Sequence, residues 1–459
     1  MRNKIFIVFL AVFLSFSTLV SATTLDRLGG KTRYETAAKI NNSSTSKTLI
    51  LVSGDNFADA LVAAPLVYHL NGEIHITQYN SLDSNTINSL NKGEFTNAVI
   101  VGGTGVVSTG IENKLKSQLK SVVRYGGKNR YETSRLVANA ILKLNDYPYA
   151  FLVSALNFPD ALSVAPVSAM TGSPILLTNG DVNNTDINAI NAATKKLYKI
   201  GGVAVVSNKM DSKVKREYER LGGVDRYETN QLIIEEFSNL FDKSNVYIAS
   251  GSNFPDALTG SALAGNNKQA IILCASSISE YTEIALSIIN PDKITALGGT
   301  GVITNDMMSK LNTINNMITE TNQNIPFADQ IAKETFRLIN KERTKNGLKP
   351  LVWDSTILTY STNKSKDMAK NNYFGHYDLK GKYTYNYMRE NGVKFSLWAE
   401  NLITANNTNN VSSIAKDMVN RWMKSSGHKS NILNKSATKS AVGIYISNNA
   451  IYGTQIFLK

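Results

Sequence analysis

Apolar residues alternate between short continuous runs and helically spaced positions through residues 24–311. The short runs predict buried strands. They are Thr48–Val52, Ala98–Val101, Ala150–Val153, Pro174–Leu177, Val246–Ala249 and Ala270–Leu273. Helical spacing predicts an amphipathic helix at Thr133–Leu144 and alanine-rich helices at Leu61–Tyr68, Leu162–Ala169 and Leu258–Ala264. Strands that alternate with helices indicate an α/β fold whose parallel sheets are covered on both faces.

Three sequence blocks recur in the same order three times. The first block contains Gly-Gly followed by Arg-Tyr-Glu-Thr and starts at Arg27, Arg124 and Arg220, which lie 97 and 96 residues apart. The second block is Asn-Phe-x-Asp-Ala, and the third is a glycine turn that follows a strand. A period of this length is that of a small domain. We therefore divide the region into repeat 1 (24–118), repeat 2 (119–215) and repeat 3 (216–311).

These blocks resemble the cell-wall-binding type 2 repeats of clostridial and related surface proteins. The resemblance implies three tandem α/β domains in a pseudo-threefold arrangement, which anchor a protein non-covalently to an anionic wall polysaccharide. Arginines beside glycine pairs can bind anions, because guanidinium groups and closely approaching backbone amides both donate hydrogen bonds. The candidate polymer-binding residues are Arg27, Arg33, Arg124, Arg130, Arg220 and Arg226.

The same motif residues also have a structural interpretation. Each Arg-Tyr-Glu could begin a helix, and its arginine and glutamate could form ion pairs within or between repeats. The aspartate of the second block, at Asp59, Asp160 and Asp256, is expected to form an Asx turn or to cap the following helix. In repeat 2 the third block, Gly201-Gly202-Val203-Ala204, lacks the Thr-Gly of the other copies, so its loop is expected to differ.

Charge and composition narrow the classes of partner. The chain has a formal net charge of +13, but residues 23–326 contain 27 basic and 27 acidic side chains. Residues 327–459 contain 20 basic and 9 acidic side chains, so the positive charge lies in the last third and suits an anionic surface. The single cysteine, Cys274, excludes an internal disulfide and is expected to be a buried core thiol.

The first 22 residues have the features of a secretory signal peptide. A basic start precedes the apolar run Ile5–Val20, and Val20-Ser21-Ala22 offers a cleavage site after Ala22. No later stretch is long and apolar enough to span a membrane. We expect a secreted protein at the cell wall or cell surface of a Gram-positive bacterium, with no transmembrane segment after signal removal. Secretion also argues against nucleic acid as a partner.

Residues 312–326 are rich in Asn and Thr and are predicted to be a linker, and residues 327–459 to be one further domain. Helices are expected at Phe327–Lys345 and Ser355–Asn371. Five blocks of this domain resemble the bacterial branch of the CAP (SCP-like) superfamily. They are Ile339-Asn340-Lys341-Glu342-Arg343, Tyr373-Phe374-Gly375-His376, Ala399-Glu400-Asn401-Leu402, Trp422–Leu433 and Gly453-Thr454-Gln455-Ile456-Phe457. The resemblance implies an α-β-α sandwich around a central antiparallel sheet.

The CAP resemblance further implies a surface cleft lined by His376, Glu400 and His428. Two imidazoles and a carboxylate could hold a divalent metal such as zinc, act as acid and base, or only fix the cleft wall through hydrogen bonds. Tyr452-Gly453-Thr454-Gln455 lacks the histidine of the animal pattern, which puts a four-ligand site in doubt. No cofactor beyond this possible ion is indicated.

Three functions remain open for the chain. The leading hypothesis is a wall-anchored, surface-layer-associated protein that displays a CAP domain without enzymatic activity. It would bind an anionic wall polymer, with other surface-layer proteins or a host surface as further partners. The alternatives make the CAP domain a metal-dependent hydrolase or a lipid- or sterol-binding module. The domain carries no marked nucleophile or acid pair of the kind that hydrolases use.

Overall fold

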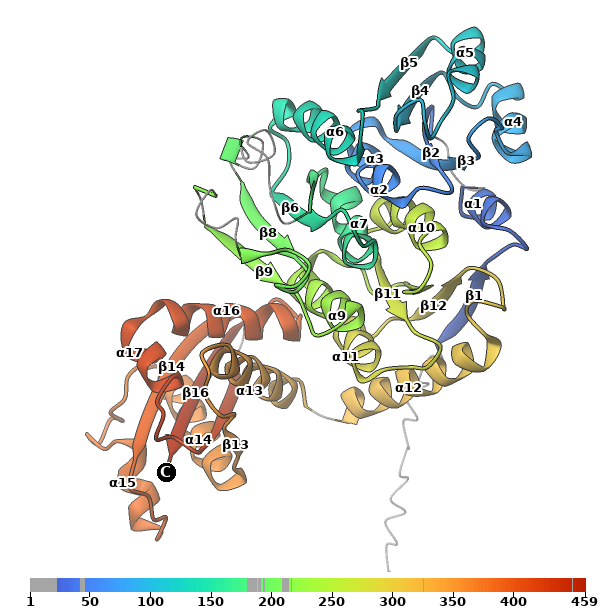
Figure 1. Ribbon diagram of the computed structural model, residues 1–459. Helices are drawn as coiled ribbons and strands as arrows, with labels where there is room; N and C mark the ends of the chain where they lie inside the picture. Colours follow the sequence, from blue (N-terminus) through green and yellow to red (C-terminus); the bar gives the residue numbers. More distant parts are fainter. Residues whose placement is uncertain are drawn as a thin grey trace, which may run out of the picture.

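The computed structural model describes residues 23–41, 46–179, 188, 191–192, 195–208, 214–215, 217–324, 326–447 and 449–459. Figure 1 shows a three-part α/β body formed by the repeats and a separate C-terminal sandwich beside it. The predicted signal peptide lies outside the described residues. No helix in the described ranges has the length and apolar character needed to cross a bilayer.

Each repeat is built on one four-stranded parallel sheet. Sheet 1 has the order β3 (Gly72–Thr77), β2 (Thr48–Ser53), β4 (Asn97–Val101), β5 (Ser121–Tyr125). Sheet 2 has the order β7 (Ile175–Thr178), β6 (Tyr149–Ser154), β8 (Lys196–Ile200), β9 (Tyr218–Leu221). Sheet 3 has the order β11 (Ala270–Cys274), β10 (Val246–Ser250), β12 (Lys293–Leu297), β1 (Thr24–Leu28). The central strands are buried on both faces, which explains why they are continuous apolar runs.

The fourth strand of every sheet comes from the start of another repeat. Strand β5 opens repeat 2 but pairs with β4 of repeat 1, and β9 opens repeat 3 but pairs with β8 of repeat 2. Strand β1 closes the set by pairing in parallel with β12 of repeat 3, so that Leu28 lies opposite Leu297. The three repeats therefore form a closed ring in which each sheet contains strands from two repeats.

Helices cover the sheets in two sets. Each Arg-Tyr-Glu-Thr block forms the first turn of a helix, and these helices are α1 (Arg33–Asn41), α6 (Arg130–Leu144) and α9 (Arg226–Glu236). The second block begins α2 (Phe57–Leu61) with α3 (Ala64–Leu70), α7 (Pro159–Thr171) and α10 (Pro255–Asn266). The outer set comprises α4 (Ser84–Asn91), α5 (Thr109–Gln118), α11 (Glu280–Ile289) and α12 (Asn305–Asn324), and a 3₁₀ turn spans Ser238–Leu240.

The alanine-rich helices α3, α7 and α10 pack on one another at the centre of the ring. Their small side chains permit this close packing, since a Cβ added at Gly265 would lie 2.5 Å from the Cβ of Ala169. At the start of these helices, Phe57, Phe158 and Phe254 form a triangle with ring centroids 5.6, 5.9 and 6.1 Å apart. Equivalent residues that meet in this way indicate the pseudo-threefold axis.

The predicted linker is largely helical. Helix α12 continues to Asn324, well into residues 312–326. Ile314 and Ile318 pack one turn apart against the core of repeat 3, and the buried Asn315 donates through Nδ2 to Pro291 O and Thr23 Oγ1, both at 2.8 Å. The Asn- and Thr-rich composition predicted a linker with a residual helix at its start, whereas apolar residues at helical spacing and these buried hydrogen bonds stabilise a helix as far as Asn324.

The C-terminal domain is an α-β-α sandwich, as the CAP resemblance implies. Its sheet has the order β13 (Val352–Trp353), β15 (Lys439–Ser447), β16 (Ala450–Leu458), β14 (Trp398–Asn406), and the three long strands are antiparallel. Helices α13 (Phe327–Lys345) and α16 (Val411–Lys424) pack on one face, and α14 (Ser355–Lys370) and α15 (Thr384–Glu390) contribute to the other. The short helix α17 (Ser426–Ile432) follows α16.

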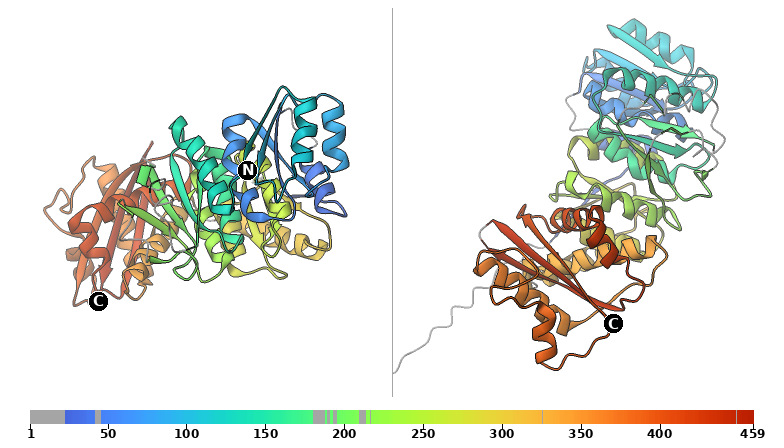
Figure 2. Two further views of the ribbon diagram at one scale, coloured as in Figure 1. Left: turned by 45° about the horizontal axis from the view of Figure 1, so that its top comes forward. Right: turned by 90° about the vertical axis from the view of Figure 1, so that its left-hand side faces the viewer.

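One buried carboxylate joins the ring to this sandwich. Glu235, near the end of α9, has a side chain only 2% exposed, and its Oε1 lies 2.9 Å from both Arg337 Nη2 and Lys341 Nζ of α13. Lys416 of α16 donates to the backbone carbonyls of Glu235 and Glu236. Figure 2 shows the two bodies side by side, with α13 and α16 on the side that faces the ring. The interface is therefore a charge cluster between three cations and the end of one helix.

Candidate functional site

The leading arginine of each repeat binds the neighbouring strand's glycine turn. Arg27 Nη1 donates to Gly298 O at 2.9 Å, and the corresponding nitrogens of Arg124 and Arg220 donate to Gly102 O and Gly201 O, both at 2.7 Å. Arg124 also pairs with Glu112, with 2.7 Å between Nε and Oε2, and Arg220 Nη2 donates to Val206 O and Asn208 Oδ1. These three predicted polymer-binding arginines hold the added strand of each sheet in place.

The second arginine of each repeat reaches across a repeat boundary. Within its own repeat, each of Arg33, Arg130 and Arg226 donates through Nη1 to a backbone carbonyl, that of Gly54, Ala155 and Gly251 respectively, at 2.5, 2.7 and 2.5 Å. The same guanidinium groups lie 5.9, 5.3 and 6.0 Å from the ring centroids of Phe254, Phe57 and Phe158. In each of these contacts the phenylalanine belongs to another repeat than the arginine. Cation–π contacts of this kind stabilise a boundary by roughly 0.5–2 kcal/mol.

The second-block aspartates face these boundary arginines. Burial raises the pKa of Asp59, and a hydrogen bond from Thr133 and the charge of Arg130, both in repeat 2, oppose this shift. Asp160 meets Thr229 and Arg226 in the same way, and Asp256 meets Thr36 and Arg33. The expectation of a helix cap was wrong, because Asn56 caps α2 and no side chain caps α7 or α10.

The glycine pairs allow close approach of two backbones. A Cβ at Gly29 would lie 2.2 Å from Gly298 O, and the equivalents at Gly126 and Gly222 would meet Gly102 and Gly201 at similar distances. The amides of Gly30 and Lys31 already donate to Thr36 Oγ1 and Glu35 Oε2, at 3.0 and 2.8 Å. The glycine pairs are thus required for strand closure, and these two amides are not free to bind an anion.

A pocket of about 650 Å³ opens where repeats 3 and 1 meet. Its lining brings charged groups of repeat 1, among them Arg27, Lys31 and Arg33, beside Asp256 and the Gly299–Val302 loop of repeat 3. Arginine has five N–H donors, so Arg33 keeps donors beyond its internal bond. Of the sequence-predicted arginines, Arg27 and Arg33 line this pocket together.

In the C-terminal domain, the structure brings His376 and Glu400 together. His376 Nδ1 lies 2.8 Å from Glu400 Oε1, and the hydroxyl of Thr384 donates to Glu400 Oε2 at 2.7 Å. The Glu400 side chain is fully buried, whereas that of His376 is 44% exposed. Glu400 therefore orients His376 from behind and does not itself face solvent.

His428, the third residue of the predicted cleft, lies on α17 and within electrostatic reach of His376. Asn401 Nδ2 donates to His428 O at 3.2 Å, and Asn431 donates to Asn401 Oδ1 at 2.8 Å. Burial lowers the pKa of His428, and the charge of His376 lowers it further. Within the part of the chain that the structure describes, no three His, Cys, Asp or Glu side chains are arranged to hold a metal ion. A metal bound by all three residues does not fit, because the Glu400 side chain is fully buried and hydrogen-bonded to His376 Nδ1, where it orients the imidazole.

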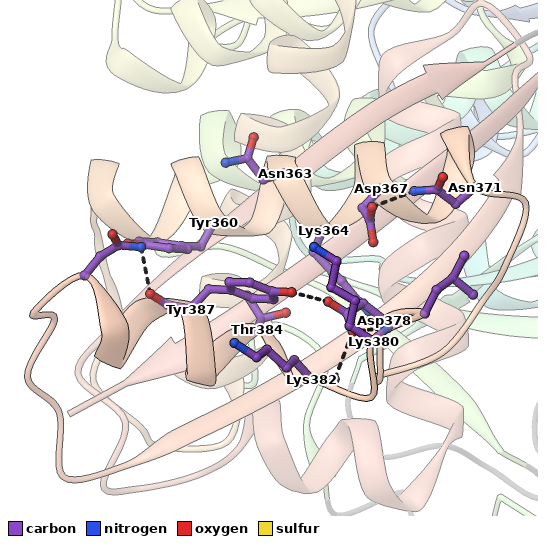
Figure 3. Close-up of a pocket in the computed structure, with 12 residues that line it drawn as sticks. Tyr360, Asn363, Lys364, Asp367, Asn371, Asp378, Lys380, Lys382, Thr384 and Tyr387 are labelled. Carbon is purple, nitrogen blue, oxygen red and sulfur yellow. Dashed lines mark hydrogen bonds between the residues drawn. The ribbon is translucent and has the colours of Figure 1, made fainter.

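A polar groove beside this cleft was not predicted from the sequence. It measures about 510 Å³ and lies between α14 and the segment that leads into α15 (Figure 3). Lys364 is 6% exposed, and its Nζ donates to Tyr373 Oη and His376 O, both at 3.1 Å. Tyr387 donates to Asp378 Oδ2 at 2.5 Å on the opposite wall. Polar residues at helical spacing from Tyr360 to Asn371 were the available signal.

Comparisons with known proteins agree with the two-part architecture. Residues 27–112, 124–211 and 220–308 match the family model described as cell wall binding domain 2 (CWB2). Residues 336–457 match the model of the cysteine-rich secretory protein family, CAP. Cwp6 from Clostridium difficile is a similar solved structure, with a TM-score of 0.59 and 26% identity, covering 65% of this chain and 48% of that one.

Two curated proteins of Bacillus subtilis (strain 168) match different parts of the chain. N-acetylmuramoyl-L-alanine amidase LytC is 33% identical over 276 residues, which are 58% of this chain and 53% of LytC. The uncharacterized protein YkwD is 35% identical over 126 residues, which are 28% of this chain and 46% of YkwD. The chain thus spans about half the length of these curated relatives.

Proposed function

Because the chain belongs to the cell wall binding domain 2 family and ends in a CAP domain, we propose that its ring anchors it non-covalently to an anionic wall polymer. Its location is the cell wall or cell surface. The observation that carries the proposal is the closed ring of three related units, which has three similar boundaries on one body. Several weak sites on one body bind a repetitive polymer far more tightly than one site does.

We propose that the polymer contacts the ring at its repeat boundaries. The pocket between repeats 3 and 1 supports this, because it exposes lysine and arginine donors beside glycine-rich loops. The six arginines remain our candidates for this contact through the N–H donors that their internal bonds leave unused. Near-neutral charge over the ring means that such contacts must be local.

Sedimentation with purified walls tests the anchor. The chain without residues 1–22 is mixed with walls before and after chemical extraction of the anionic polymer, and the same is done with the chain ending at Asn324, which retains the core clusters of the ring. Both proteins are expected to bind intact walls and not to bind extracted walls. Equal binding to extracted walls, or loss of binding when the CAP domain is removed, would refute the proposal.

For the CAP domain we propose a displayed binding role without hydrolysis. Glu400 is fully buried with both oxygens engaged, so it is poorly placed to exchange protons with a substrate. The net charge of this domain suits an acidic partner, such as an anionic host surface or another surface-layer protein. Wall or host-glycan hydrolysis by the wild-type chain that disappears in His376→Ala would overturn this assignment.

We propose that a divalent ion binds in the cleft of the CAP domain through the imidazoles of His376 and His428 alone. Calorimetric titration of the chain with Zn²⁺ tests it. Binding is expected to be lost in His376→Ala and in His428→Ala, whereas identical binding by both variants and the wild type would exclude this site.

A further inference from the structure

Repeat 1 contains a buried pair of ionisable side chains on an edge strand. Glu73 and His75 belong to β3, the outermost strand of sheet 1, and are only 8% and 6% exposed. His75 Nε2 lies 2.9 Å from Glu73 Oε1, and His75 Nδ1 lies 2.8 Å from Thr86 Oγ1. Buried ionisable groups of this kind cost stability unless they are fully paired.

The pair belongs to a chain of hydrogen bonds that ends at an unsatisfied oxygen. Asp83 caps α4 through Oδ1, and its Oδ2 accepts a short hydrogen bond from the Thr86 hydroxyl. Thr86 can therefore only accept from His75 Nδ1–H, which directs His75 Nε2 toward Glu73. Glu73 Oε2 is buried and has no hydrogen-bond partner among the residues that the structure describes. A buried oxygen that makes no hydrogen bond destabilises the folded protein.

The other two repeats carry apolar residues at the same positions. Strand pairing shows which residues correspond. His75 lies opposite Leu51 in sheet 1. In the same way Leu176 lies opposite Leu152 in sheet 2, and Ile272 lies opposite Ile248 in sheet 3. Glu73 corresponds in the same way to Ala270, which lies opposite Val246. The other repeats form the same sheet without an ionisable pair at this place. A buried ionisable pair that the fold does not need is typical of a binding site.

A pocket of about 500 Å³ lies directly over this pair. Its walls are α1 and α4, which flank β3 in Figure 1, and Glu73 and His75 are among its lining residues. Asn85 and Asn88 line the α4 wall, and their amide side chains have no partner among the described residues.

Apart from the buried pair Glu73 and His75, the charged residues that line this pocket balance. Lys39 and Lys92 line it together with Glu35 and Glu94. Lys92 Nζ lies 3.7 Å from Glu94 Oε1, and Lys39 Nζ donates to Gly29 O at 2.6 Å. A balanced rim with free amides suits an uncharged group rich in hydroxyls better than a phosphate.

We propose that this pocket of repeat 1 binds one neutral sugar residue of a glycan, and that the Glu73 carboxylate turns toward the pocket so that Oε2 accepts from a sugar hydroxyl. His75 positions the carboxylate, and Asn85 and Asn88 bind further hydroxyls. The inference rests on the proposed wall binding and adds a saccharide-reading site that repeats 2 and 3 lack.

The test substitutes the apolar residues of repeat 3 into repeat 1. Glu73→Ala/His75→Ile is made in the chain without residues 1–22, and binding is measured by calorimetry with soluble polymer released from purified walls. The variant is expected to bind about tenfold more weakly or worse, the effect of losing one hydrogen bond to a charged group. It is also expected to melt at the same temperature as the wild type or higher.

Two further variants keep the test decisive. Asn85→Ala/Asn88→Ala changes only the pocket wall and is expected to weaken binding even if the first variant fails to fold. Thr295→Val removes a buried 2.8 Å hydrogen bond to Asn245 in repeat 3 and is expected to leave binding unchanged.

The outcomes separate this inference from the function on which it rests. Equal polymer binding by the wild type and both pocket variants would overturn the pocket and leave wall anchoring intact. A wild-type chain that binds neither walls nor polymer would refute both. Weaker binding by Thr295→Val to the same degree as the pocket variants would show a general loss of stability and overturn the pocket.

Discussion

Replacing Glu235 by glutamine is expected to release the CAP domain from the ring. The substitution preserves the shape of the side chain and its place beside Gln231, whose Nε2 donates to Glu235 Oε2 at 2.8 Å. It removes the negative charge that Arg337 and Lys341 share. Both cations then face a neutral amide at the interface, where they are partly desolvated.

The magnitude follows from the acidity of Glu235. Burial opposes its ionisation, but Arg337 and Lys341 outweigh burial and lower the pKa of Glu235 from 4.5 to about 2. That fall corresponds to roughly 3 kcal/mol. Because the side chains of Arg337 and Lys341 are 39% and 41% exposed, solvent screening reduces the figure, and we expect about 2 kcal/mol. The ratio of docked to undocked molecules would then fall by about 30-fold.

Acid should have the same effect on the wild type. Since the folded pKa lies below the ordinary value, the stabilisation is complete above about pH 4.5 and is lost as the pH falls toward 2. Glu235→Gln should lack this part of the pH dependence, because the amide that replaces the Glu235 carboxyl does not titrate.

Small-angle X-ray scattering at pH 7 measures the release. The variant is expected to have a larger radius of gyration than the wild type, and its two bodies should melt as separate calorimetric transitions. Asp417→Asn is the matched control, because Asp417 forms an exposed 3.3 Å ion pair with Arg421 on α16, next to Lys416. Scattering and melting of Glu235→Gln identical to those of the wild type and this control would refute the reasoning.

Three further predictions concern the ring and the cleft. Arg130→Gln should destabilise the ring by about 1–3 kcal/mol in urea unfolding, because Asp59 then stays buried without a cation. Unchanged stability together with weaker wall binding would instead favour direct contact between Arg130 and the polymer. Gly29→Ala should cost about 1–3 kcal/mol or more in the same assay, because its Cβ would overlap a carbonyl 2.2 Å away, whereas Gly301→Ala, with nothing within 4 Å, should be nearly neutral. In an NMR titration His428 should have a pKa below 6.5 that rises in His376→Ala, and an unchanged pKa would contradict the coupling of the two imidazoles.

Elements with strong local patterns could be predicted from the sequence. The buried central strands and the helix Phe327–Lys345 occur where their apolar patterns place them, and Cys274 is a buried core thiol. The motif-based α-β-α sandwich is likewise confirmed. In each case residues close in the sequence carry the whole signal.

Features that depend on distant partners could not be predicted. Strands β1, β5 and β9 are four or five residues long and mostly partly exposed, so their periodicity is weak. Their pairing with another repeat depends on tertiary packing. The partner of Asp59 is likewise 74 positions away, at Thr133. The buried pair on β3 was missed because its neighbours predict only an ordinary strand.

The closing strand also determines when the ring can be completed. Asp26 on β1 and Lys293 on β12, 267 positions apart, meet with 2.7 Å between their charged atoms. During synthesis β1 must wait for almost the whole ring to appear before its partner strand exists. Contacts of such long range form slowly, and an unpaired strand edge is prone to wrong association in the interval. A chain interrupted before β12 would keep β1 unpaired, so the ring can be completed only in molecules that contain all three repeats.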